Sequence, residues 1–200
     1  YGTCSSASGG VNSARGVAAD RYGNVYIADT GNNRYRVVVG PASYNGVVNP
    51  LAAILALDPS YSGLTAATAA GRIYPILGGF TALSAVGAAC AGAGGGSALD
   101  ADGDGCPFYQ TLAGSGAQGI AVDSYGNVIF GDNGSTLLRV LYVGGTAMAN
   151  AITVNNPSVT SPVVGSVYVL AGGGTTGVGA SPAKGTSINI DSNIFKVTVG

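Results

Sequence analysis

Residues 14–38 read ARGVAADRYGNVYIADTGNNRYRVV, and residues 117–141 read AQGIAVDSYGNVIFGDNGSTLLRVL. The two stretches align without a gap, because each position in the second lies 103 residues after its counterpart (14 against 117). A glycine-rich chain produces chance matches, but it does not place Asp, Tyr, Gly, Asn and Val in register with a distant Arg-Val pair. We interpret the stretches as an internal repeat. The recurring positions to which we assign a structural role are Asp20, Gly23, Asn24, Asp29, Arg36, Asp123, Gly126, Asn127, Asp132 and Arg139.

Each copy has the residue pattern of antiparallel β-structure. Residues 20–24 predict a turn, because an Asp side chain bonds back to nearby backbone and a Gly tolerates positive φ. Residues 25–27 and 34–39 are rich in β-branched and aromatic side chains and predict two strands. A further strand is predicted by IYPILGG at 73–79, which matches VYVLAGG at 167–173. We therefore expect an all-β fold with four antiparallel strands per repeat, which is the content of a propeller blade.

These residues resemble the NHL repeat, a β-propeller family. Its typical pattern runs Gly-Val-Ala-Val-Asp, then Gly-Asn-Val-Tyr-Ile-Ala-Asp-Thr-Gly-Asn-Asn-Arg-x-Arg. Residues 16–36 match it closely, and residues 119–139 match it as far as Asp132. The linking segments LAGGG (170–174) and GDGCP (103–107) resemble those of long secreted bacterial members. The resemblance implies a propeller fold, but such propellers serve as binding platforms, as extracellular scaffolds and, less often, as hydrolases or lyases.

The repeat also predicts how the chain is organised. Closed propellers need roughly 4–8 blades, and this chain supplies two and the start of a third. It is then either a fragment of a longer propeller, or neighbouring copies complete it and cover its strand edges. The apolar segment 50–57 packs over its own blade or forms a subunit contact. The expected units are a first blade (1–89) with an insertion (40–71), a glycine-rich hairpin and second blade (90–191) with an insertion (143–165), and the start of a third repeat (192–200).

The composition excludes several classes of protein. With 8 basic and 9 acidic residues the net charge is −1, so the chain lacks the concentrated basic face that nucleic acid requires. It has no His, which excludes the Ser-His-Asp triad and His metal ligation. No apolar run approaches the roughly 20 residues of a membrane-spanning helix, so we expect no membrane span. The hydrophobic content of 46% argues against disorder.

The cysteines favour a location outside the cytoplasm. Cys90 and Cys106 bracket the glycine-rich hairpin, and a disulfide between them, which the family resemblance also favours, would imply an oxidising compartment. Two free buried thiols are the alternative. Cys4 is left over, and an odd cysteine in a secreted chain suggests intermolecular pairing. We therefore expect an extracellular or cell-surface protein.

Residues 100–105 read DADGDG, which matches the opening of a calcium loop. Three carboxylates this close repel one another without a cation. The twelfth position of the loop is Thr111, so the usual bidentate Glu is missing and a polar hairpin cap is the alternative reading. Asp100, Asp102 and Asp104 are therefore the candidate calcium ligands, and no cofactor is required.

Asp29 and Asp132 could perform acid–base chemistry only if both faced one pocket. Their place in matching turns favours a structural role, as carboxylates that accept backbone N–H groups, while Arg36 and Arg139 would form a repeated salt bridge or a stacked strand face. We thus expect no catalytic residue and no enzyme activity. The function we expect is an extracellular structural protein whose copies self-assemble into a surface fibre or scaffold. The alternatives are a carbohydrate- or protein-binding module of a longer secreted propeller protein, and a calcium-dependent propeller hydrolase or lyase.

Overall fold

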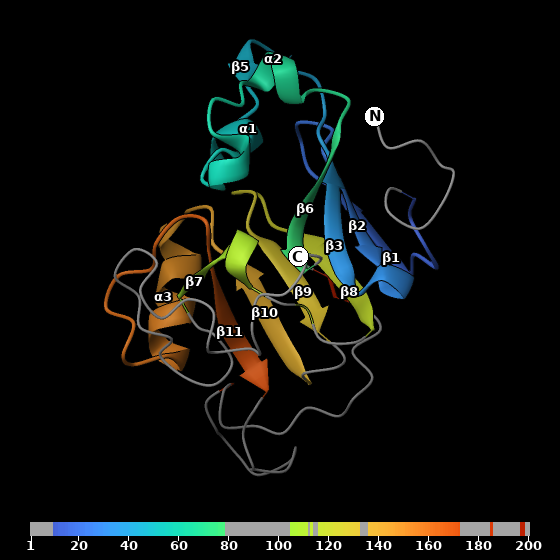
Figure 1. Cartoon of the computed structure of the whole chain (residues 1–200). Coiled ribbons are helices and arrows are strands. Elements are labelled where there is room, and N and C mark those ends of the chain that lie inside the picture. The colour runs from blue at the N-terminus through green and yellow to red at the C-terminus, as the bar shows by residue number, and fades with distance from the viewer. Residues whose placement is uncertain are drawn as a thin grey trace.

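Two antiparallel β-sheets form the core of the described chain (Figure 1). The structure, a computed structural model, describes residues 10–78, 105–111, 113, 116–132, 136–172, 185 and 197–198. The strands of the first sheet lie in the order β1 (Gly16–Ala19), β2 (Val25–Asp29), β3 (Arg34–Val38) and β6 (Ile73–Gly78). Those of the second lie in the order β7 (Cys106–Pro107), β11 (Ser166–Gly172), β10 (Leu137–Leu141), β9 (Val128–Asp132) and β8 (Ala117–Val122). The expected all-β class is confirmed, and neither sheet closes into a barrel.

The first sheet has the four strands that the repeat predicts, whereas the second sheet has five, so the prediction of four is wrong there. The additional strand, β7, pairs antiparallel with β11, where Cys106 lies opposite Val167 and Pro107 opposite Ser166. A strand of two residues is too short to show an alternating pattern in the sequence, so its pairing depends on where the fold brings it.

The repeat extends to the details of strand pairing. The β3–β6 ladder shifts register between Tyr35 and Arg36, and the β10–β11 ladder shifts between Leu138 and Arg139, 103 residues later. A register shift of this kind is a β-bulge, which bends the strand and increases its twist. The two sheets therefore share this bulge position and the order of their four repeat strands, whereas a further shift between Ala117 and Gly119 in the β8–β9 ladder has no counterpart in the β1–β2 ladder.

A glycine ends the last strand of each repeat for a steric reason. Gly78 has a φ of +71°, and a Cβ there would lie 2.6 Å from the carbonyl oxygen of Asn33. Gly172 has a φ of +98°, and a Cβ there would clash with the carbonyl oxygen of Thr136, the repeat counterpart of Asn33. Asn33 and Thr136 have positive φ values themselves, of 49° and 56°. Only glycine combines this backbone conformation with so close an approach.

The insertions fold into short elements beside the sheets. The first contains a hairpin and two helices: β4 (Ser43–Tyr44), β5 (Val47–Val48), α1 (Leu51–Leu55) and α2 (Ala66–Ala69). A capping box between Thr65 and Thr68 begins α2. The apolar segment 50–57 forms α1, whose buried side chains join the core between the sheets, so this segment packs within its own chain. Three 3-10 turns complete the described elements: Thr30–Asn32, Pro59–Tyr61 and Phe108–Gln110.

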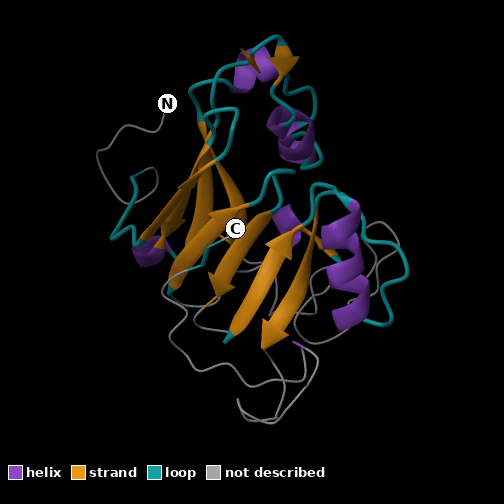
Figure 2. Ribbon diagram, turned by 180° about the vertical axis from the view of Figure 1, so that it is seen from behind, coloured by secondary structure: helices purple, strands orange, loops and turns teal. Residues whose placement is uncertain are grey.

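The second insertion contains the longest described helix, α3 (Thr146–Asn155), which lies against β11 on the side of the second sheet away from the first (Figure 2). Ile152 of α3 and Val159 pack there on Val140 and Tyr168. Of the expected third repeat, only 197–198 is described, and Val197 lies against this second core. No described helix is long and apolar enough to cross a membrane.

Candidate functional site

The turn that opens each repeat is held by an Asp side chain. Asp20 Oδ1 accepts hydrogen bonds from the backbone N–H groups of Tyr22 (2.9 Å) and Asn24 (3.1 Å), and its Oδ2 accepts one from Asn24 Nδ2 (2.7 Å). Asp123 makes the same three hydrogen bonds one repeat later, including one from Asn127 Nδ2 at 2.7 Å. These carboxylates fix the turns and are not presented to a ligand.

The residues beside these Asp side chains continue the same arrangement. Gly23 and Gly126 have φ values of +77° and +92°, which the turn requires. Asn24 Oδ1 accepts a hydrogen bond from the backbone N–H two residues beyond β3 (2.8 Å), and Asn127 Oδ1 accepts one two residues beyond β10 (2.7 Å). Each Asn thereby ties the first turn of its repeat to the start of its insertion.

A buried ion pair recurs at the other end of each sheet. Arg36 Nε lies 2.7 Å from Asp29 Oδ2, and Arg139 Nη1 lies 3.1 Å from Asp132 Oδ2. All four side chains are almost completely shielded from solvent. Burial lowers the pKa of Arg36, and the charge of Asp29 opposes that effect. Of the two predicted arrangements, the arginines thus form a repeated salt bridge, and each bridge joins two side chains of the same sheet.

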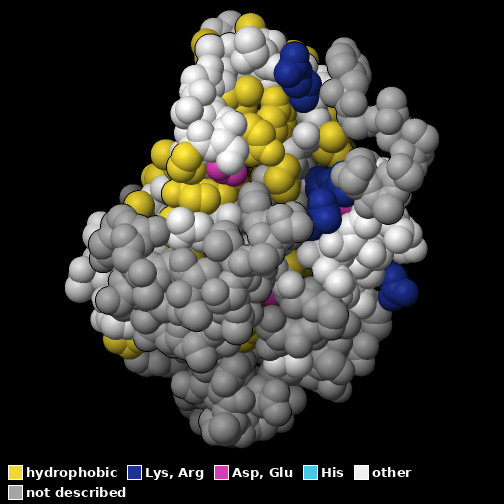
Figure 3. Space-filling model, viewed as in Figure 1, with side chains coloured by type: hydrophobic (Ala, Val, Ile, Leu, Met, Phe, Trp, Pro, Cys, Tyr) yellow, Lys and Arg dark blue, Asp and Glu magenta, His cyan; other side chains and the backbone are white. Residues whose placement is uncertain are grey.

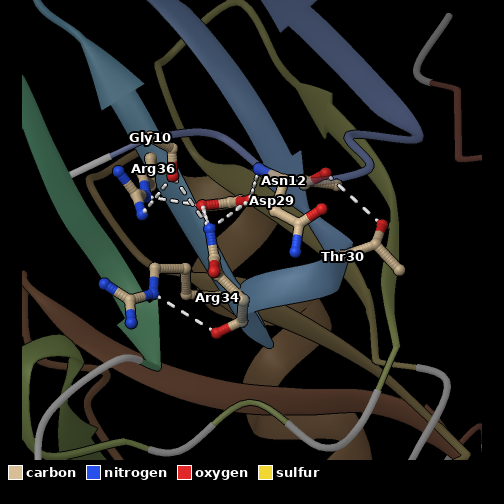
Figure 4. A network of polar contacts seen from close by, with 8 residues as sticks. Gly10, Asn12, Asp29, Thr30, Arg34 and Arg36 are labelled. Atoms are coloured by element: carbon tan, nitrogen blue, oxygen red, sulfur yellow. Dashed lines mark hydrogen bonds and ion pairs between the residues drawn. The ribbon is translucent and has the colours of Figure 1, made fainter. Parts of the chain in front are cut away.

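Figure 4 shows how the first ion pair is surrounded. Asp29 Oδ1 accepts from the backbone N–H of Asn12 (2.7 Å), and the amide of Asn32 donates to both carboxylate oxygens (2.9 Å each). Arg36 Nη2 donates to the carbonyl oxygen of Gly10 (3.2 Å). Asp29 therefore has its acceptor capacity filled by groups that hold the segment before β1, and it is not set up as a general base.

The remaining predicted site residues lie mostly outside the described part of the chain. Cys106 is buried in β7, whereas Cys4 and Cys90 are not described, so the Cys90–Cys106 disulfide stays a prediction. Asp100, Asp102 and Asp104 are likewise outside the described residues, and the calcium site stays a prediction. Within the described ranges no group of three or more His, Cys, Asp or Glu side chains could hold a metal ion.

Tyr35 anchors the contact between the sheets. Its hydroxyl donates to the carbonyl oxygen of Gly131 (2.6 Å) and accepts from the backbone N–H of Gln118 (3.2 Å), and its ring lies 4.7 Å from that of Phe130. Burial, followed by the nearby charge of Asp132, raises its pKa. The repeat comparison did not single out this residue, because its counterpart in the second copy is Leu138.

The strand pairing gives each sheet two distinct faces. We name the two faces of each sheet the tyrosine face and the valine face, after residues on each. The tyrosine face of the first sheet packs on the valine face of the second, and both belong to the same core. The tyrosine face of the first sheet consists of Tyr26, Ala28, Tyr35, Val37 and Tyr74, and its repeat counterpart in the second sheet consists of Ile129, Gly131, Leu138, Val140 and Tyr168. The valine face of the second sheet contains Ile120, Val128, Phe130, Leu141 and Val167, and its repeat counterpart in the first sheet contains Val17, Val25, Ile27, Val38 and Ile73. The arginines of the two ion pairs lie on these same faces, Arg139 opposite Phe130 and Arg36 opposite Ile27.

The two valine faces differ in what covers them. In the second sheet these five apolar residues are buried in the core that this face shares with the first sheet and α1. In the first sheet Val17 is 65% exposed and Ile73 is 38% exposed, and the other three residues are partly exposed. The first sheet therefore has an open apolar face, and this face is the strongest candidate for a functional surface in the described chain.

Comparison with known proteins adds no family to this description. No protein-family model matches the chain, and no curated protein matches it.

Proposed function

We propose that this chain is a non-enzymatic extracellular structural protein, built of NHL-like propeller blades, whose copies self-assemble into a surface fibre or scaffold. The observation that carries the proposal is the stacking of two repeated sheets through unequal faces, with one valine face left open. A repeat array that leaves a terminal stacking face uncovered offers that face to a further repeat of the same kind.

The sheet arrangement supports the propeller part of the proposal. In a propeller, successive four-stranded blades pack face to face around a central axis, with their innermost strands adjacent. Here β1 and β8, the first strands of the two repeats, are in contact, and the tyrosine face of one sheet lies on the valine face of the next. The shared bulge position gives both sheets the same irregularity in strand pairing, as expected of equivalent blades.

The polar groups support a non-enzymatic role. Asp29 and Asp132 each bond to an Arg of their own sheet, and Asp20 and Asp123 each hold a turn. An acid–base pair would need carboxylates that share one pocket and reach a substrate. Charged residues are only 8% of the chain, and Figure 3 shows few of them on the face it presents. A weakly charged surface of this kind favours association between copies.

Negative-stain electron microscopy and sedimentation of the purified chain test the proposal. We expect polymers or large assemblies whose fraction rises with protein concentration. Non-reducing electrophoresis would in addition reveal copies joined through Cys4. A chain that stays monomeric at every concentration tested, with or without calcium, would refute the self-assembly function and favour the ligand-binding alternative.

A further inference from the structure

The internal repeat indicates what kind of surface fits the open valine face. In the second sheet, the residues that correspond to Val17 and Ile73 are Ile120 and Val167, and both are buried in the core that contains the tyrosine face of the first sheet and the buried side chains of α1. The same strand order and bulge underlie both valine faces. The complement of a valine face in this protein is therefore a tyrosine face.

The tyrosine face that remains in the chain belongs to the second sheet, and α3 covers it. Val140 and Tyr168 on this face are buried in one cluster with Ile152 of α3 and with Val159. These two sheet residues are the counterparts of Val37 and Tyr74, which are buried in the core between the sheets. The helix thus occupies the place at which the valine face of a following sheet would lie.

The helix α3 is attached to the second sheet through Ile152, Met148 and Ala149. Of its ten residues only Ile152 is fully buried, and no side chain caps its N-terminus. Gly145, which precedes it, has a φ of +91°, a conformation that glycine adopts readily. Asn156 follows the helix and donates to the carbonyl oxygen of Val169 (2.8 Å), which holds its C-terminal end to β11. Elements with few buried apolar contacts open at low free energy.

We propose that the open valine face of the first sheet is the docking surface for a second copy of this chain, which presents the tyrosine face of its second sheet after α3 has moved away. This assignment rests on the proposed self-assembly. Each copy carries one surface of each kind, so the contact is head-to-tail and generates a ring where the rotation closes and a filament where it does not.

The edge of the open valine face carries arginines, which suit a surface that is exposed to water in the free chain and covered in an assembly. Arg15 and Arg34 stand where the buried counterpart face has Gln118 and Leu137. An Arg side chain places its apolar stem along a hydrophobic surface while its guanidinium stays in water, and Arg is enriched at protein interfaces. On this face Val17 lies opposite Ile27, and Ile27 lies opposite Arg36, whose guanidinium is buried against Asp29.

Sedimentation velocity on matched variants tests the docking surface. Val17→Asp places a charge within the proposed contact, at the repeat position of the buried Ile120, and should weaken association by at least about tenfold. Val48→Asp is the control, because Val48 is also 65% exposed but lies on the β4–β5 hairpin. Both variants should keep the wild-type melting temperature, since both side chains are exposed.

A second pair of variants tests the displacement of α3. Ile152→Ala removes the buried anchor of the helix and should tighten association by about fivefold or more, because less binding free energy is spent on releasing the helix. Val154→Ala, on the exposed side of the same helix, should leave association unchanged. Hydrogen exchange of the α3 amides should increase when the wild-type chain assembles.

The outcomes separate the inference from the function on which it rests. A wild-type chain that never associates refutes the proposed function and the docking surface together. Assemblies that persist in Val17→Asp as in Val48→Asp leave self-assembly standing and refute this docking surface. Loss of association in Val17→Asp without any effect of Ile152→Ala or any change in α3 exchange refutes the head-to-tail contact with the second sheet.

Discussion

Removal of a single oxygen atom from Tyr35 measures how strongly the two sheets are joined. Tyr35→Phe keeps the ring contact with Phe130 but leaves the carbonyl oxygen of Gly131 and the N–H of Gln118 without the hydroxyl that now lies 2.6 Å and 3.2 Å from them. Each buried polar group that loses its partner costs about 1–3 kcal/mol. Because the two groups share one hydroxyl and can relax, we expect the variant to lose about 2–4 kcal/mol of stability.

Urea unfolding of wild type and variant, followed by tyrosine fluorescence and by circular dichroism, gives this difference as a shift in midpoint at constant slope. Tyr125→Phe is the matched control, since its side chain is 63% exposed and its loss of a hydroxyl should cost less than about 0.5 kcal/mol. If Tyr35→Phe were no less stable than Tyr125→Phe, the two sheets would not be anchored through the Tyr35 hydroxyl. The packing of the tyrosine face on the valine face would then need another explanation.

Three further perturbations have defined outcomes. Burial raises the pKa of Tyr26 and of Tyr35, so in the folded chain both stay protonated above the ordinary tyrosine pKa of about 10. The free energy of unfolding should therefore be constant below pH 10 and fall above it by roughly 1.4 kcal/mol per pH unit for each of these tyrosines. Urea midpoints at pH 9–11 measure this slope, and an equal slope in Tyr35→Phe would contradict the expectation. Gly172→Ala should destabilise by more than the roughly 1 kcal/mol expected for Gly71→Ala, because both have positive φ but only Gly172 meets a carbonyl oxygen; equal melting temperatures would argue against the close approach. Asp132→Ala leaves a buried guanidinium without its carboxylate and should cost about 3–5 kcal/mol in thermal or urea unfolding, and a loss below 1 kcal/mol would show that the pair is hydrated in solution.

Under the proposed self-assembly, the position of α3 would connect the folding of one chain to the association of many. A repeat array needs its terminal faces covered, and a helix that covers a sheet face prevents further stacking until it moves. In this protein the covered and the open faces are repeat counterparts of two surfaces that already fit each other inside the chain. Assembly and capping would then compete for one surface, which makes the stability of α3 a control on polymer growth.

The local pattern of the sequence was sufficient to determine the strands and turns of each repeat. The turns at Asp20 and Asp123 and the strands β2 and β9 lie where the aligned residues predicted them, because Asp, Gly and Asn act on the backbone within four residues of themselves. The antiparallel class followed from the same pattern, since short β-branched runs separated by such turns pair with their neighbours.

The tertiary structure alone decided which surfaces meet. Tyr35 and Leu138 hold the same place in the repeat, yet one binds the neighbouring sheet and the other lies near a helix, because the two sheets have different neighbours in space. For the same reason Val17 is exposed while Ile120 is buried, although both continue the same strand pattern. Whether a face is buried depends on the element that covers it. The alternation of residues along a strand specifies which side chains share a face, but it does not specify the element that packs on that face.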